Sequence, residues 1–226
     1  MINIIIPSHN QAQYLREALD SCQNQTVSCF ITIIDDGSTD NSLEVAKEYA
    51  KETNVQIISQ VNKGLSSARN TGIMNTRDDD DDYLLFLDAD DILLPNCVER
   101  IEQEIEKTHA DIIAPSFKCF GKAQDTVILM PNPTIEDFKT ANRIGYCQAI
   151  KREALLGVGG YNPKMVWGAE DLDLTFDLLK RGKKLVTIPE VLWLYRVKEN
   201  SMWTETAKHQ AEFMNQIKLN HPEIKW

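Results

Sequence analysis

The sequence predicts an α/β fold in which helices flank a mostly parallel central sheet. In the first half of the 226 residues, short apolar runs alternate with segments of helical periodicity, which is the order of successive β-α-β units. The apolar runs show no polar alternation, as expected for strands buried on both faces. The expected strands are Ile2–Ile6, Phe30–Ile34, Val55–Ile58, Tyr83–Leu87 and Asp111–Pro115, and the expected helices are Ala12–Cys22, Leu43–Lys51, Leu65–Asn75 and Pro95–Lys107.

The second half of the chain carries weaker patterns. Residues 116–145 contain Gly121, Pro131 and Pro133 among polar residues, which predicts an irregular segment with one or two antiparallel strands. The elements expected after it are a helix at Asp171–Lys180, strands at Lys184–Ile188 and Val191–Tyr195, and a last amphipathic helix at about Thr204–Leu219. The length suits one domain, and neither an internal repeat nor a linker divides it.

Charge and composition narrow the range of partners. Lys and Arg number 24 against 34 Asp and Glu, a net charge of −10, which disfavours nucleic acid as a main partner. Apolar runs are too short to span a bilayer, and Ile2–Pro7 lacks the basic start of a signal peptide. We therefore expect a cytoplasmic protein without a transmembrane segment.

Three of the predicted strands lead into polar clusters. The clusters are Pro7-Ser8-His9-Asn10, Asp35 to Asp40, and Asp88-Ala89-Asp90-Asp91. Because the carboxyl ends of parallel strands meet at one edge of the sheet, where ligands bind, the three clusters should face one crevice. The acidic run Asp78–Asp82 is instead expected to be a solvated loop, since adjacent carboxylates alternate in direction and repel.

The sequence lacks the usual phosphate cradles. No GxGxxG opens a helix after the first strand and no GxxxxGK[ST] occurs, so phosphate charge would have to be met by a metal ion. Asp88 and Asp90, two residues apart at a strand end, suit Mg²⁺ or Mn²⁺. An acidic turn or a cap for the next helix explains the same residues equally well.

Seven segments together resemble the family 2 glycosyltransferases of the GT-A fold. They are Ile5 to Asn10, Ile34 to Asp40, Asn62 to Asn70, Phe86 to Asp91, Gly159-Gly160-Tyr161, Trp167 to Leu174 and Tyr195-Arg196. The resemblance covers residues 2 to about 202 and implies one GT-A domain over residues 1–226. In it, residues 1–115 would bind the nucleotide, 116–203 the acceptor, and 204–226 would form a C-terminal helix.

For the donor, the resemblance implies a pocket in which a few polar groups contact a nucleotide-diphosphate sugar. Asp36 would accept a hydrogen bond from uracil N3–H, whereas Asp35 or Asp40 would form the turn. Asp90 would be the main ligand of Mn²⁺ or Mg²⁺, with Asp88 on the ribose and the metal. The other implied donor contacts are Pro7, His9, Asn10, Asn62, Gly64, Arg69 and Ala89. Arg69 has an alternative role in an ion pair with Asp35 or Asp88.

For the chemistry, the resemblance places Glu170 and Asp171 across the sugar. Asp171 is the expected general base for an acceptor hydroxyl, and Glu170 would orient the acceptor or donor sugar; the alternative for both is capping of the helix N-terminus. Trp167 would stack on a sugar of the acceptor, unless it is a core or lid residue.

One residue departs from the family pattern. Many relatives have a His two residues after the Tyr-Arg pair, which helps to bind metal or diphosphate, whereas this chain has Lys198. A charged ammonium has no lone pair for a metal, but it can pair with a diphosphate. Metal dependence would then be lower than in relatives.

The predicted activity is inverting transfer of a sugar, as a hexosyl- or N-acetylhexosaminyltransferase, from a nucleotide-diphosphate sugar, expected to be UDP-linked, to a glycan or lipid-linked acceptor in polysaccharide synthesis. The alternatives are an inactive nucleotide-sugar-binding module and a nucleotidyltransferase. The last helix carries Phe213, Met214, Ile217 and Leu219, which would dock on the domain, on a partner, or peripherally on the inner face of the membrane.

Overall fold

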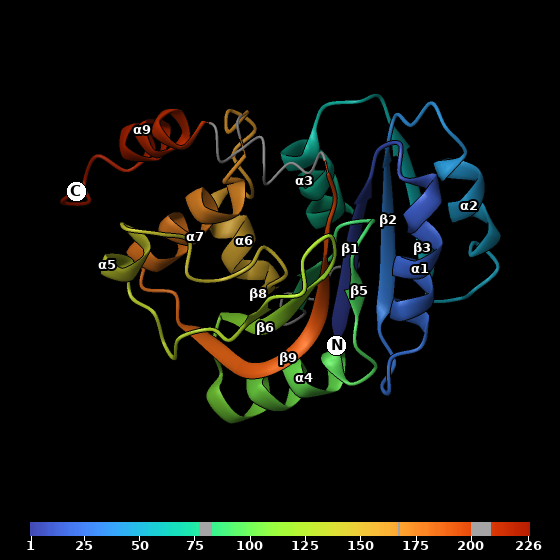
Figure 1. Cartoon of the computed structure of the whole chain (residues 1–226), viewed down its shortest axis with the longest axis horizontal. Coiled ribbons are helices and arrows are strands. Elements are labelled where there is room, and N and C mark those ends of the chain that lie inside the picture. Colours follow the sequence, from blue (N-terminus) through green and yellow to red (C-terminus); the bar gives the residue numbers. More distant parts are fainter. Residues whose placement is uncertain (77–82, 167, 200–208) are drawn as a thin grey trace.

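The computed structural model describes residues 1–76, 83–166, 168–199 and 209–226, and it has the expected α/β architecture (Figure 1). Among these residues the strands form one sheet in the order β3-β2-β1-β4-β8-β6-β9-β5, with β7 paired to β6. The β1–β2, β2–β3, β1–β4 and β6–β9 pairs are parallel, and the pairs made by β5, β7 and β8 are antiparallel. The antiparallel part therefore lies mainly in the second half of the chain, as predicted.

The elements have the following bounds. The strands are β1 Ile2–Ser8, β2 Phe30–Asp36, β3 Val55–Gln60, β4 Tyr83–Phe86, β5 Ile92–Leu93, β6 Ile112–Gly121, β7 Thr126–Val127, β8 Ala149–Lys151 and β9 Leu185–Val197. The helices are α1 Ala12–Gln23, α2 Ser42–Glu48, α3 Leu65–Asn75, α4 Cys97–Thr108, α5 Ile135–Phe138, α6 Arg152–Val158, α7 Glu170–Lys180 and α9 Gln210–Asn220.

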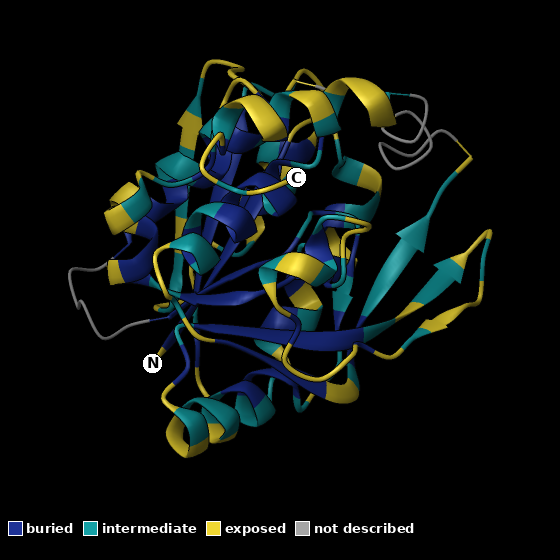
Figure 2. Ribbon diagram, turned by 90° about the vertical axis from the view of Figure 1, so that its left-hand side faces the viewer, coloured by how far each residue is buried: buried dark blue, intermediate teal, exposed yellow. Residues whose placement is uncertain are grey.

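Two apolar cores lie on opposite faces of the sheet. Ile4 and Ile6 of β1 pack with α1 and α4, whereas Ile5 between them packs with α3 and with the residues of α6 and α7. Successive side chains of a strand point to opposite faces, so a strand covered on both sides needs apolar residues at every position. Figure 2 shows the result, a buried sheet between helices whose outer surfaces are exposed.

The predicted strands Lys184–Ile188 and Val191–Tyr195 are one strand. Strand β9 runs through Pro189 and Glu190, and its register with β6 shifts on both sides of Ser116. The Ser116 hydroxyl donates to the Ile188 carbonyl (2.8 Å) and accepts from the Leu129 amide (3.0 Å). This side chain therefore satisfies the Ile188 carbonyl at the register shift and links β9 to the Leu129 backbone.

Further differences concern short elements. The hairpin β6–β7 confirms antiparallel pairing within residues 116–145, but β5, α5, β8 and α6 were not predicted, because two- to seven-residue elements carry too little periodicity.

Asp78–Asp82 lies outside the described residues, as does Thr204–Lys208 of the predicted last helix. The single-domain organisation remains a prediction, although strands from residues 1–115 and 116–203 share the sheet. In the part of the chain that the structure describes, no helix combines the length and apolarity that crossing a membrane requires.

Candidate active site

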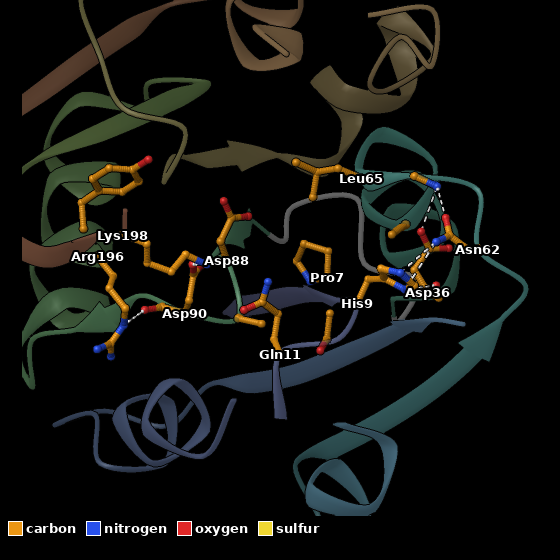
Figure 3. Close-up of a pocket in the computed structure, with 15 residues that line it drawn as sticks. Pro7, His9, Gln11, Asp36, Asn62, Leu65, Asp88, Asp90, Arg196 and Lys198 are labelled. Carbon is orange, nitrogen blue, oxygen red and sulfur yellow. Dashed lines mark hydrogen bonds and ion pairs between the residues drawn. The ribbon is translucent and has the colours of Figure 1, made fainter. Parts of the chain in front are cut away.

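A cavity of about 430 Å³ opens at the carboxyl ends of β1, β2 and β4 (Figure 3). Eight of the predicted donor residues line it, namely Pro7, His9, Asp36, Asn62, Gly64, Asp88, Ala89 and Lys198. Asp90 also lines it, together with residues that were not predicted: Ser8, Gln11, Leu65, Ala68, Tyr195 and Arg196. The three polar clusters therefore meet at one crevice, as the strand order required.

Asp36 organises one end of this cavity. Its carboxylate accepts hydrogen bonds from the Lys63 amide (2.9 Å), the Gly64 amide (2.8 Å) and the Gln60 side chain (2.7 Å). Gly64 has φ 85°, a conformation that glycine adopts without strain. The carboxylate thus fixes the 62–64 segment, and Oδ2, with one of these three donors, retains capacity for a further one.

The turn after β2 is held by neighbouring carboxylates, as predicted. Asp35 accepts from the Ser38 amide (3.3 Å), and Asp40 accepts from the Ser42 amide (2.9 Å). Gly37 has φ 70°, and a Cβ there would lie 2.7 Å from the Asn62 amide nitrogen. Only glycine therefore allows this turn to pack so closely against the 62–64 segment.

His9 and Asn10 have different roles. His9 Nδ1 lies 2.8 Å from the Asp36 carbonyl, to which it must donate, so His9 Nε2 is the acceptor for the side-chain Nδ2 of Asn62 at 3.1 Å. Asn10 has φ 54° and does not line the cavity. Its side-chain oxygen accepts from the Thr39 amide (2.8 Å), so in this structure Asn10 braces the neighbouring turn.

Two aspartates and two cations meet at the other end of the cavity. Lys198 forms an ion pair with Asp90, and Arg69 donates to Asp88 Oδ1 at 2.8 Å. Burial raises the pKa of Asp88 to about 6 against the lowering effect of Arg69, and the charge of Asp90 adds to the rise. Mg²⁺ is usually held by one or two carboxylates plus substrate phosphates, so this oxygen set fits Mg²⁺ or Mn²⁺ once Lys198 leaves Asp90.

The acidic turn itself is held by residues that the sequence did not single out for this task. Asp91, 1% exposed, accepts from the Arg196 amide (2.6 Å) and from the Tyr146 hydroxyl. The Arg196 side chain donates to the Asp90 carbonyl (2.7 Å). Asp91 and Arg196 belong to segments that resemble the family motifs, so the sequence could have indicated a role for them. Tyr146 follows a segment without a recognisable pattern, and nothing in the sequence indicated its role.

Ser8 is a further residue that was missed. It is 2% exposed, lines the cavity, and its hydroxyl has no hydrogen-bond partner among the described residues. A buried polar group without a partner is costly. Its position at the end of β1, in the polar cluster, was the only available signal.

A second cavity, of about 460 Å³, adjoins the first and contains the predicted catalytic residues. The two cavities share Leu65, Asp88 and Tyr195. Glu170 and Asp171 line the second, and Asn142 donates to Asp171 Oδ2 at 2.9 Å. A ligand that reaches from one cavity into the other would pass Asp88.

Glu170 and Asp171 lie in the first turn of α7, and neither is its N-cap residue. The N-cap is Ala169, with φ 60° and no side-chain capping bond, and the two carboxylates point to Arg69 and Asn142 instead. Burial, together with the charge of Glu170, raises the pKa of Asp171 to about 6. A carboxylate with this pKa is charged at neutral pH and is a stronger base than an ordinary one.

Arg69 joins the two carboxylate groups. It is 1% exposed, and its guanidinium donates to Asp88 and, at 2.6 Å, to Glu170 Oε1. The rings of Tyr146 and Tyr161 lie 5.3 and 5.1 Å from the guanidinium carbon. The ion pair expected as an alternative is therefore present with Asp88. Arg69 lines the second cavity, and its contact with a donor remains a prediction. Trp167, the predicted acceptor contact, lies outside the described residues.

The fold corresponds to that of solved transferase structures. S. aureus TarS in complex with UDP-GlcNAc matches with a TM-score of 0.79 at 17% identity, over 97% of this chain and 66% of that chain. Mannosyltransferase PcManGT from Pyrobaculum calidifontis, in complex with GDP-Man and Mn²⁺, matches with a TM-score of 0.73 at 16% identity, over 100% of this chain and 65% of that one. The fold is therefore that of the GT-A glycosyltransferases, as predicted.

The family follows from the sequence comparison. Residues 3–159 match the family described as Glycosyl transferase family 2. The uncharacterized glycosyltransferase EpsJ of Bacillus subtilis (strain 168) is 29% identical over 219 residues, which are 89% of this chain and 62% of that relative. The chain belongs to glycosyl transferase family 2, which confirms the resemblance; it spans less than two thirds of this relative's length.

Proposed function

We propose that the chain is an inverting glycosyltransferase that moves a sugar from UDP to a hydroxyl of a glycan or lipid-linked acceptor. The observation that carries the proposal is the junction of the two cavities at Asp88. One cavity offers groups for a nucleotide diphosphate, and the other offers a carboxylate base. A sugar attached to the diphosphate would extend from the first cavity into the second.

The donor is proposed to be held from base to diphosphate along the first cavity. Asp36 Oδ2 would accept uracil N3–H, which favours UDP over nucleotides that lack this donor. Ser8, whose hydroxyl has no partner within the described part of the chain, would add a hydrogen bond. Asp88 and Asp90 would hold Mg²⁺ or Mn²⁺, which would supply Lewis-acid stabilisation of the departing diphosphate.

The proposed step is a direct displacement. The acceptor hydroxyl gives its proton to Asp171, its oxygen bonds to the anomeric carbon, and the bond from that carbon to the diphosphate oxygen breaks, so UDP leaves with the electron pair. One displacement inverts the anomeric configuration. Glu170, fixed by Arg69, orients the sugar, and Asn142 holds the Asp171 carboxylate through Oδ2.

Lys198 is proposed to share the work of the metal. Its ammonium contacts Asp90 and lines the first cavity, so it would be within reach of a diphosphate bound there. Asp88 and Asp90 would hold the metal, and Lys198, once released from Asp90, would pair with the diphosphate. This arrangement supports weaker metal dependence than in relatives that have a histidine there.

One experiment tests the proposed function against its alternatives. UDP release would be measured with a panel of UDP- and GDP-sugars, with saccharide and lipid-linked acceptors, and with or without Mn²⁺. Turnover with a UDP-sugar that is lost in Asp171→Asn supports the proposal. Tight UDP binding without turnover would indicate an inactive binding module, whereas pyrophosphate formation from UTP and a sugar phosphate would indicate a nucleotidyltransferase. The cytoplasmic location, at the inner face of the membrane or away from it, remains a prediction.

A further inference from the structure

The C-terminal helix α9 docks on the domain. Ile217 is fully buried in the core that contains residues of α6 and α7, and Phe213 and Met214 are partly buried against the same core. Leu219, on the same helix, is 66% exposed. Figure 1 shows α9 on the side of the sheet that carries α6 and α7. Docking on the domain, one of the three roles considered for this helix, is therefore observed.

A buried polar network fixes the end of α9 to the catalytic helix α7. His221 and Asp173 are 1% and 2% exposed, and His221 Nε2 lies 2.9 Å from Asp173 Oδ1. Lys180, which can only donate, lies 3.0 Å from His221 Nδ1, so Nε2 carries the proton that Asp173 accepts. Asn220 donates to Asp173 Oδ1 at 2.8 Å. Asp173 is two residues from Asp171, so this network ties α9 to the helix turn that bears the proposed base.

The other end of α9 forms a wall of the second cavity. Gln210, Phe213 and Met214 line it, although none of them lines the first cavity. The wall combines apolar side chains with polar groups from elsewhere, including Lys139, Thr140 and Asn142. A hydrocarbon chain would remove these polar groups from water without offering them hydrogen bonds, which is unfavourable. A pyranose ring suits both kinds of group, because it has hydroxyls at its edge and an apolar C–H face.

We infer that Phe213 of α9 is the platform on which the acceptor sugar ring stacks beside Asp171, and that the Asp173–His221 pair positions this platform. The face of an aromatic ring is electron-rich and attracts polarised C–H groups. The inference rests on the proposed function and deepens it: the acceptor is a saccharide, recognised through one ring face, and α9 is the element that selects it. The donor, by contrast, is held by groups of the first cavity.

The test compares Phe213→Leu, which keeps apolar volume but removes the ring face, with Phe213→Tyr, which keeps the face. Leu219→Ala is the matched control on the exposed side of the same helix. Binding of methyl glycosides is followed by saturation-transfer NMR on the full chain with UDP bound. UDP affinity and slow hydrolysis of the UDP-sugar by water report the donor site independently.

Phe213→Leu should weaken binding of the preferred glycoside about three- to tenfold, the worth of one aromatic contact. Phe213→Tyr and Leu219→Ala should leave it unchanged, and UDP affinity and donor hydrolysis should stay as in the parent protein in all three variants. Equal glycoside binding in Phe213→Leu and the parent overturns the inference. So does a loss of donor hydrolysis in Phe213→Leu, which would put Phe213 on the donor sugar, or a parent protein that binds UDP but no glycoside. A parent protein that binds no nucleotide would refute the proposed function instead.

A second comparison tests the positioning role. His221→Gln keeps a donor for Asp173, whereas His221→Leu removes it, and both are measured at a temperature where each variant is folded. The glycoside affinity should fall with His221→Leu by as much as with Phe213→Leu and recover in His221→Gln, with UDP affinity unchanged throughout. Unaltered glycoside binding in folded His221→Leu would remove the positioning role.

Discussion

Replacing Asp171 by Asn should separate catalysis from stability, because the two respond in opposite directions. The substitution keeps the size of the side chain and an acceptor for Asn142, but removes the charge that takes the proton. We expect kcat to fall about 10²–10⁴-fold, the usual contribution of a general base. Donor affinity should barely change, since the first cavity is untouched.

The stability effect follows from the raised pKa. The folded state raises the pKa of Asp171 to about 6, so between about pH 4 and 6 it binds a proton more tightly than the unfolded chain. The stability contributed by this proton is present at acid pH and lost as the pH rises through about 6. A shift of about two units corresponds to about 3 kcal/mol at most, and solvent screening of a half-buried group reduces it to about 1–2 kcal/mol.

The assay is thermal unfolding of the parent protein and Asp171→Asn at pH 8 and pH 4, alongside turnover. At pH 8 the variant should melt about 2–8 °C higher, and the difference should vanish near pH 4, where both forms are neutral. In the parent protein, kcat should fall about tenfold between pH 7 and pH 5 as the base is protonated.

The matched control is Asp173→Asn on the same helix. Asp173 is buried among donors from His221, Asn220 and Asn162, so this variant should lose stability at pH 8 instead of gaining it. The reasoning about Asp171 fails if Asp171→Asn melts lower at pH 8 and keeps its turnover, the behaviour of a structural carboxylate. If Glu170→Gln loses turnover while Asp171→Asn retains it, the base is the neighbouring residue.

Three further outcomes follow from the donor cavity. Asp90→Ala should abolish Mn²⁺-stimulated UDP binding, measured by calorimetry, with an unchanged melting temperature; retained stimulation would reject Asp90 as the main ligand. Asp36→Ala should weaken UDP binding by about 1–3 kcal/mol through the lost charged hydrogen bond. Gln60→Ala removes only one donor to Asp36 and should have a smaller effect. Equal losses of UDP affinity in the two variants would make the role of Asp36 purely structural. Lys198→Ala should reduce UDP affinity in EDTA more than in Mn²⁺, and Lys198→His should increase Mn²⁺ affinity. An identical loss of UDP affinity in both buffers would contradict the proposal that Lys198 and the metal both neutralise the diphosphate.

The first half of the fold could be read from the sequence because its signals are local. Strands buried on both faces are apolar at every position, and the helices between them repeat their apolar residues on one side. The polar clusters that follow β1, β2 and β4 then had to meet at one sheet edge. This reasoning identified the crevice that contains Asp36, Asp88 and Asp90, whereas only the family resemblance singled out Lys198.

What the sequence by itself determined was therefore the α/β fold, the crevice at the strand ends and the types of chemical group in it. Only the tertiary structure decided which groups are in contact, since those partners are far apart in the chain. Arg69 bonds to Glu170, 101 residues away, and Arg196 bonds to Asp91, 105 residues away. No local pattern encodes such pairs, because they form only when packing brings buried charges together and desolvation makes an unpaired one unfavourable. The same reason explains why α9 was recognised as a helix but its place beside Asp171 was not.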